Sequence, residues 1–265
     1  MKTVVITGGT RGIGASLVKD FLKLGWNVAW SGTREKTVQD SLSSISVSYP
    51  GNSYAAFVCD VSVESDLKAL WDNAAKKFGQ IDIWVNNAGR GNEQSRFDKT
   101  DPATFMGIID TNVKGLMLAT HVACNRMLQQ GHGAIYNMEG LGSDGRMISG
   151  LTPYGTSKRA VRYFSEAFAK EVNGSPVIIG TISPGMVLTD LTMNQVRKDP
   201  GNNRSLIKIY NILANEPETV TPFLVKRMTE NRKNGAKITW LTKGKLLWSF
   251  LKAPFSKRDI VSKYL

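Results

Sequence analysis

Tyr154 and Lys158 are the two side chains of this sequence whose types and spacing most clearly suggest chemistry. They stand four residues apart in a stretch with a helical pattern, which places both on one face of a helix. An ammonium close to a phenol favours the phenolate and lowers the pKa of the tyrosine toward the working range. The pair therefore predicts proton transfer to or from an oxygen atom of a bound molecule, the alternative being an incidental pair on a helix.

A glycine-rich turn near the N-terminus suggests a phosphate site. The segment 7–14, TGGTRGIG, follows a β-branched stretch and opens a helical one. Glycines let the backbone turn tightly beside a pyrophosphate, and the helix N-terminus offers free N–H groups to its charge. The spacing differs from G-x-G-x-x-G, and an ordinary glycine turn is the alternative. The residues expected to contact the cofactor here are Gly8, Thr10, Arg11, Gly12, Ile13 and Gly14.

The end of the second predicted strand indicates which nicotinamide cofactor fits. The residues there are Ser-Gly-Thr33-Arg34, and none of them is the acid that binds the ribose 2′-OH of NAD. A carboxylate would repel a 2′-phosphate, whereas Arg11 and Arg34 can pair with one bidentately. We therefore predict NADPH, with Thr33 and Arg34 among its contacts, the alternative being two solvated arginines.

Strand and helix patterns alternate from residue 2 to about residue 190. The expected strands are Lys2–Thr7, Asn27–Trp30, Ala55–Val58, Ile81–Val85, Ala134–Met138 and Val177–Ile182. The expected helices are Ala15–Leu24, Glu35–Ser44, Ser65–Phe78, Phe105–Gln129 and Tyr154–Val172. This alternation predicts an α/β fold: one Rossmann-like doubly wound parallel sheet with helices on both faces. We expect residues 1–190 to form its dinucleotide-binding and catalytic core.

The alternation ends after Asp190, and the charge changes there too. The chain has 34 Lys and Arg against 22 Asp and Glu, a net charge of +12. Residues 191–265 carry 15 of those cations and only 5 of the acids. We expect residues 191–265 to be a helical, basic C-terminal extension of the same domain, with helices near Leu206–Leu213 and Pro217–Thr229. A basic appendage on a near-neutral core does not suggest nucleic-acid binding.

Residues 237–258 interleave aromatic and cationic side chains. Such a segment fits contact with a membrane surface, where aromatic rings insert and cations meet anionic headgroups. It fits equally a cap on the core or on an oligomer interface. No apolar run is long enough to span a bilayer, no secretory signal is visible, and Cys59 and Cys124 lack the spacing of metal ligands.

The motifs together resemble the short-chain dehydrogenase/reductase family over about residues 2–190. The resemblance rests on the glycine turn, Asn86-Asn87-Ala88-Gly89 after the fourth strand, Asn112 in a helix, and Tyr-x-x-x-Lys at 154–158. It implies that Tyr154 protonates a carbonyl oxygen, Lys158 holds the nicotinamide ribose, and Asn112 serves a water-mediated proton relay. It also implies a homo-oligomer. Further cofactor contacts implied by the resemblance are Asp60, Val61, Asn87, Ala88, Gly89, Pro184, Gly185, Val187 and Thr189.

One departure from the family pattern concerns the serine that usually binds the substrate carbonyl. Its expected position falls on Leu141, or on Gly140 if the strand ends are aligned, and neither side chain can donate a hydrogen bond. We favour Ser143 as the replacement. Otherwise backbone N–H groups bind the carbonyl, or the catalytic set is incomplete. Glu139 is expected to be a solvated or capping carboxylate, the alternative being that it faces the site.

A narrower resemblance, to chlorophyll b reductases, lies in segments 137–145, 185–191 and 211–220. It implies NADPH-dependent reduction of the 7-formyl group of chlorophyll b, or of its chlorophyllide, to 7-hydroxymethyl. The partner would be an apolar pigment, and the location cytoplasmic or plastid stromal, at a thylakoid surface. The alternatives are a reductase of another apolar carbonyl compound (a steroid, quinone or lipid) and a non-catalytic NADP(H)-binding sensor.

Overall fold

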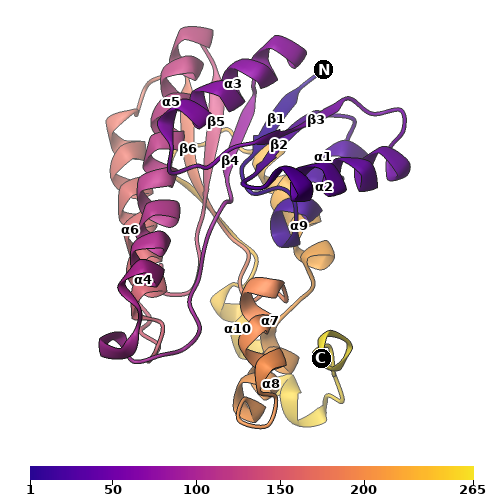
Figure 1. Ribbon diagram of the computed structural model, residues 1–265, viewed down its shortest axis with the longest axis vertical. Coiled ribbons are helices and arrows are strands. Elements are labelled where there is room, and N and C mark those ends of the chain that lie inside the picture. Colours follow the sequence, from indigo (N-terminus) through magenta and orange to yellow (C-terminus); the bar gives the residue numbers. More distant parts are fainter.

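The computed structural model describes all residues from 1 to 265 and contains one sheet of seven parallel strands (Figure 1). The strand order is β3-β2-β1-β4-β5-β6-β7. The strands are β1 Thr3–Ile6, β2 Asn27–Gly32, β3 Tyr54–Val58, β4 Ile83–Asn86, β5 Gly133–Met138, β6 Val177–Ser183 and β7 Ala236–Thr239. The predicted α/β fold with a doubly wound parallel sheet is confirmed.

Helices cover both faces of the sheet, as their apolar stripes require. On one face lie α1 Gly12–Lys23, α2 Glu35–Ser48 and α9 Pro217–Glu230, whose buried side chains share a cluster with those of β1 and β2. On the other face lie α3 Glu64–Phe78, α5 Leu116–Gln130 and α6 Thr152–Glu171. Short elements complete the chain: α4 Pro102–Ile109, the π-helical turn Asp110–Gly115, and the 3₁₀ turns Phe97–Lys99, Ala253–Phe255 and Ser262–Tyr264.

The chain after residue 190 differs from the prediction at two elements. α7 Asp190–Lys198 is a helix that was not among those predicted, and a capping box between Thr189 and Thr192 starts it. β7 pairs with β6 in parallel, although the alternation of strand and helix was predicted to have ended. Only Ile238 of β7 is buried. A four-residue strand with one buried side chain shows no alternation of apolar and polar residues from which it could be predicted. α9 and β7 thus return to the main body.

The remaining C-terminal elements form a lobe beyond the carboxyl ends of the strands (Figure 1). It contains α7, α8 Arg204–Leu213 and α10 Lys243–Lys252, and it has a small core of its own around Met193, Tyr210 and Val261. No helix of the structure is long and apolar enough to cross a bilayer.

The sheet positions the site through its strand order. β1 lies between β2 and β4, so the connections leaving β1 and β4 turn to opposite sides of the sheet. In open α/β sheets a crevice forms at this point, at the carboxyl ends of the strands, and ligands bind there. The glycine turn follows β1, and Asn87-Ala88-Gly89 follows β4.

Candidate active site

The segment after β4 fixes the glycine turn after β1. The Thr7 hydroxyl accepts hydrogen bonds from the backbone N–H groups of Asn87 and Ala88, both at 3.1 Å. The side-chain amide of Asn87 donates to the carbonyls of Thr7 and Gly8 at 2.9 and 3.0 Å. Gly8 has φ +65°, and a Cβ added to it would lie 2.9 Å from the Ala88 Cα. Asn87 therefore shapes the turn with its side chain.

The turn leaves the start of α1 open to a phosphate. The helix begins at Gly12, and no side chain caps its first N–H groups. The loop after β6 packs against this turn. A Cβ added to Gly12 would lie 3.2 Å from Cγ2 of Thr189 in that loop. Within that loop, Val187 is buried and Gly185 has φ +72° against Leu241. These residues fit a dinucleotide pyrophosphate between the turn and the loop.

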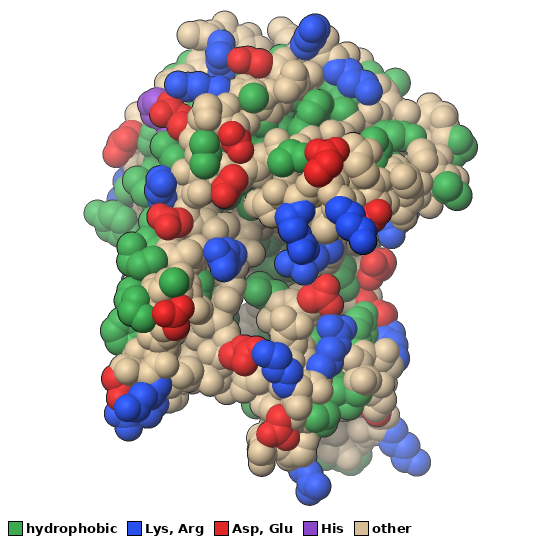
Figure 2. All heavy atoms as spheres, viewed as in Figure 1, with side chains coloured by type: hydrophobic (Ala, Val, Ile, Leu, Met, Phe, Trp, Pro, Cys, Tyr) green, Lys and Arg blue, Asp and Glu red, His purple; other side chains and the backbone are tan.

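Exposed cations lie at the same edge of the sheet. Thr33 and Arg34 follow β2, and both they and Arg11 are exposed. Arg11 lies 3.9 Å from the exposed Asp190 carboxylate, too far for a hydrogen bond. Figure 2 shows Lys and Arg side chains gathered above a hollow in this face of the molecule. The donor set fits the negative charge of a phosphorylated ribose.

Asp60 and Val61, two of the predicted cofactor contacts, lie in different environments. Asp60 follows β3, is exposed, and accepts hydrogen bonds from the backbone N–H and hydroxyl of Ser62 at 2.9 and 2.7 Å. Val61 is buried against Gly115 of the π-helical turn. The cofactor contacts of both remain predictions.

Tyr154 and Lys158 lie in the first half of α6, as predicted, but their electrostatics differ from the prediction. Lys158 is 4% exposed, and its Nζ donates to the Met138 carbonyl at 3.1 Å. Burial lowers the pKa of Lys158 to about 8, although Glu139 opposes this shift. Burial raises the pKa of Tyr154 to about 12, so the predicted lowering is wrong in this structure. The reason is that the ammonium is directed to Met138 and lies 5.8 Å from the centre of the tyrosine ring.

Asn112 lies within the π-helical turn and is buried. Its Oδ1 accepts from the Arg90 backbone N–H at 2.8 Å, and its Nδ2 donates to the Arg90 carbonyl and the Ser157 hydroxyl, each at 2.9 Å. A Cβ added to Gly89 would lie 3.4 Å from that Oδ1 and 3.8 Å from Nζ of Lys158. Asn112 therefore joins the loop after β4 to α6 beside the lysine, and its part in a relay remains a prediction.

Gly140 occupies the position next to the tyrosine hydroxyl. A Cβ added to Gly140 would lie 2.4 Å from the Tyr154 hydroxyl oxygen, closer than any real contact. Ser143 is 2% exposed, and its hydroxyl accepts from the Gly140 N–H at 3.0 Å, which closes a tight turn. Ser143 thus lies near the site, and its substitution for the usual serine remains a prediction.

Sequence reasoning missed Ser157 and favoured the wrong environment for Glu139. Glu139 was expected to be solvated or capping but is only 7% exposed, because α6 covers it. The Ser157 hydroxyl accepts from Asn112 and donates to the Tyr154 carbonyl at 2.7 Å, which joins the two elements that carry the proton-transfer residues. The helical spacing of Ser157 from Tyr154 was the only available signal.

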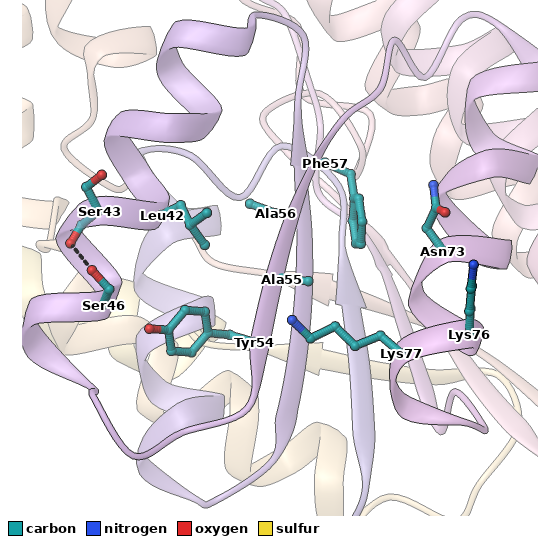
Figure 3. A pocket seen from close by; sticks show the side chains of 10 residues that line it. All are labelled: Leu42, Ser43, Ser46, Tyr54, Ala55, Ala56, Phe57, Asn73, Lys76 and Lys77. Carbon is teal, nitrogen blue, oxygen red and sulfur yellow. Dashed lines mark hydrogen bonds between the residues drawn. The ribbon is translucent and has the colours of Figure 1, made fainter.

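A groove lined by other residues lies elsewhere in the molecule (Figure 3). It is an open groove of about 800 Å³ along the free edge of β3, between α2 and α3. Tyr54, Phe57, Lys76 and Lys77 line it, and none of the predicted site residues does. The chemistry of the chain is therefore assigned to the carboxyl edge of the sheet.

Residues 2–200 match the family model for the short chain dehydrogenases. The chain belongs to this family. It is thus an oxidoreductase enzyme with a nicotinamide cofactor, and the alternative of a non-catalytic sensor is set aside.

Relatives with known names extend the comparison. A rice (Oryza sativa subsp. japonica) protein, the chloroplastic chlorophyll(ide) b reductase NOL, is 36% identical over 84% of this chain and 65% of its own length. The chain thus spans somewhat less than two thirds of that relative. A 3alpha-hydroxysteroid dehydrogenase of Mediterraneibacter gnavus is 32% identical over 72% of this chain and 75% of its own. The closed form of serine dehydrogenase complexed with NADP+ has a TM-score of 0.78 at 26% identity, covering 90% of this chain and 94% of that one.

Proposed function

We propose that the protein reduces the 7-formyl group of chlorophyll b, or of chlorophyllide b, to a 7-hydroxymethyl group with NADPH. The observation that carries the proposal is Gly140, a residue without a side chain, directly beside the Tyr154 hydroxyl. A Cβ at this position would collide with that hydroxyl, so the glycine lets Tyr154 approach the end of β5, where the family places its serine if the strand ends are aligned. The similarity to the rice chlorophyll(ide) b reductase over 84% of the chain supports the same substrate class.

Residues of this chain can supply the proton that the carbonyl oxygen takes up during reduction. Tyr154 is neutral near pH 7, because burial raises its pKa to about 12, and a neutral phenol can give a proton to the carbonyl oxygen. Lys158 and Asn112 hold the elements around that hydroxyl, through Met138 and Ser157. When bound, NADPH supplies the hydride that converts the aldehyde carbon to an alcohol carbon.

The preference for NADPH belongs to the proposal. Arg34 and Arg11 are exposed at the carboxyl edge of the sheet, and no acid follows β2 before Arg34. A guanidinium binds a phosphate bidentately, so both arginines can hold the 2′-phosphate. Comparable kcat/KM values for NADPH and NADH would contradict this assignment.

The test is NADPH consumption with chlorophyll b or chlorophyllide b in mild detergent. We expect a product with the absorbance of the 7-hydroxymethyl pigment, and no product from Tyr154→Phe. If NADPH binds and neither pigment is reduced, the pigment assignment is wrong. A panel of steroids, quinones and lipid aldehydes then tests the second candidate, which the hydroxysteroid dehydrogenase similarity supports.

The C-terminal segment supports contact with a membrane surface. Trp240 belongs to the fold, because it packs edge-on against Phe223 with ring centres 5.4 Å apart. α10, by contrast, has no buried residue, and Trp248 and Phe255 are 58% and 91% exposed. Residues 237–258 contain no Asp or Glu. We therefore assign to α10 and the turn after it a peripheral contact with anionic lipid. The name of the chloroplastic rice relative supports a plastid membrane as the location.

Sedimentation with lipid vesicles tests this contact. We expect the protein to pellet with phosphatidylglycerol-containing vesicles and to stay in solution with pure phosphatidylcholine. The double variant Trp248→Ala/Phe255→Ala should lose most of the pelleting, whereas Val47→Ala, which removes an exposed apolar side chain of α2, should keep it. Equal pelleting of all three proteins would contradict the assignment. The homo-oligomer remains a prediction.

A further inference from the structure

β3 is the edge strand of the sheet, and no other segment of the chain pairs with its outer side. Cys59 directly follows β3, and its N–H donates to the Gly32 carbonyl of β2 at 2.9 Å. Alternate residues of a parallel strand bond to the same neighbour, so the residues between them turn their N–H and C=O groups to the free side. The residues that face outward are Tyr54, Ala56 and Val58. Such a row of free backbone groups is a template for a further strand.

β3 lacks the features that usually protect a free edge. Natural edge strands carry lysine, proline or a bulge, or are covered by a helix or loop. The sequence of β3 is Tyr-Ala-Ala-Phe-Val, and its five residues pair with β2 in an unbroken register. The last of them, Val58, is 46% exposed. An apolar edge of this kind is suited to accept an extended segment by strand addition.

The groove around β3 sets the chemistry of the segment that it can accept. Serine and asparagine line it together with two lysines, and no acidic residue does. The ion pairs of α3 involve Lys68 and Asp72, so the exposed Lys76 and Lys77 of its last turn are free to meet carboxylates. Figure 3 shows the Lys77 side chain extending from α3 toward β3. The charge of the groove therefore complements an acidic ligand.

We propose that the free edge of β3 binds an extended, acidic segment of a partner protein as an added strand. The backbone of that segment pairs with the three outward residues of β3. Its side chains alternate between the two faces of the sheet. One set meets Lys76 and Lys77 on the α3 side, and the other meets Leu42 and Tyr54 on the α2 side. A segment of about six residues with alternating acidic and apolar side chains matches the roughly 17 Å length of the strand.

A second copy of this chain matches the groove less well. α2 and α3 line the groove on its two sides, so pairing β3 with β3 brings both helices of each copy together as well. The second copy also presents the same two lysines and no acid from its own edge. A single extended acidic segment meets neither obstacle. The groove contains none of the predicted cofactor or catalytic residues, so this inference does not depend on the proposed function.

Fluorescence anisotropy with a labelled peptide tests the proposal. The probe is Glu-Val-Glu-Val-Glu-Val with blocked ends. The control peptides are Lys-Val-Lys-Val-Lys-Val and the acidic peptide N-methylated at every residue, which cannot donate backbone hydrogen bonds. We expect only the probe to bind. Lys76→Glu/Lys77→Glu should raise its Kd about tenfold or more, because attraction at two sites becomes repulsion. Lys170→Glu/Lys233→Glu makes the same change of net charge at exposed lysines outside the groove and should keep the wild-type Kd.

Amide hydrogen exchange followed by NMR locates the bound peptide. The amides of Ala56 and Val58 should exchange rapidly in the protein alone and slowly with the acidic peptide bound. Slow exchange of both amides in the protein alone would show that a second copy covers the edge, and it would overturn the proposal. Equal binding of the acidic and basic peptides, equal Kd values for the wild type and Lys76→Glu/Lys77→Glu, or no binding of the acidic peptide up to about 1 mM would overturn it too.

Discussion

Replacing Lys158 with methionine should abolish activity and make the cofactor-free protein more stable near neutral pH. Burial lowers the pKa of Lys158 from 10.5 to about 8. Each pKa unit corresponds to about 1.4 kcal/mol, so holding the ammonium in the folded protein costs about 3 kcal/mol. Methionine removes this cost but loses the hydrogen bond to the Met138 carbonyl, worth about 1 kcal/mol. The net gain in the free energy of unfolding should be about 2 kcal/mol.

The difference in stability between Lys158→Met and the wild type should depend on pH. Below about pH 8 the ammonium is charged in both the folded and the unfolded wild type, so the full cost is present. Between about pH 8 and 10.5 the unfolded chain binds more protons than the folded one, and wild-type stability from this group rises with pH. The advantage of Lys158→Met should therefore shrink as pH rises through this range.

Thermal unfolding followed by circular dichroism measures both effects. For a chain of this size, about 2 kcal/mol corresponds to a rise in Tm of about 4–8 °C near pH 7. The rise should be nearly absent near pH 10, where other titrations affect both proteins equally. A Lys158→Met protein that is less stable than the wild type near pH 7, or a Tm difference that does not change with pH, would refute the reasoning.

Two further substitutions test the cofactor site and the core. Arg34→Ala should raise the Kd of NADPH about tenfold or more, because a hydrogen bond to a charged group is worth about 1.5–3 kcal/mol, and should leave NADH binding unchanged. Fluorescence titrations that show equal losses for both cofactors would contradict this role. Thr221→Val should cost about 1–3 kcal/mol in urea unfolding, because the Thr221 hydroxyl donates to the buried Asp20 carboxylate at 2.6 Å. Thr229→Val, on the exposed side of the same helix, is the control, and an equal loss in both would contradict the assignment.

The sheet and the order of the site motifs along the chain could be predicted from the sequence. Alternating patterns located six of the seven strands, and the glycine turn and Asn87 lie where the strand order reverses. Tyr154 and Lys158 could be paired because helix geometry is local, so spacing alone predicts a shared face. Thr189 and Thr192 stand three residues apart and form a capping box, and this spacing was the available signal for the start of α7.

The electrostatics of the site could not be predicted, because burial and direction are tertiary properties. Glu139 reads as a surface carboxylate in the sequence, and only the packing of α6 on β5 removes it from water. Lys158 could have pointed to Tyr154 or away from it, and the Met138 carbonyl decides the direction. The four-residue pairing of β7 with β6 likewise depends on the edge that β6 offers.

Hydride transfer to the pigment tests the proposed function most directly. The enzyme is incubated with chlorophyllide b and NADPH carrying deuterium at C4 of the nicotinamide, each stereoisomer in turn, and the pigment is analysed by mass spectrometry. We expect a 7-hydroxymethyl product with one additional deuterium from one of the two stereoisomers, and none with Tyr154→Phe. An unreduced pigment in the presence of bound NADPH, or a reduced pigment without deuterium from either stereoisomer, would contradict the proposed function.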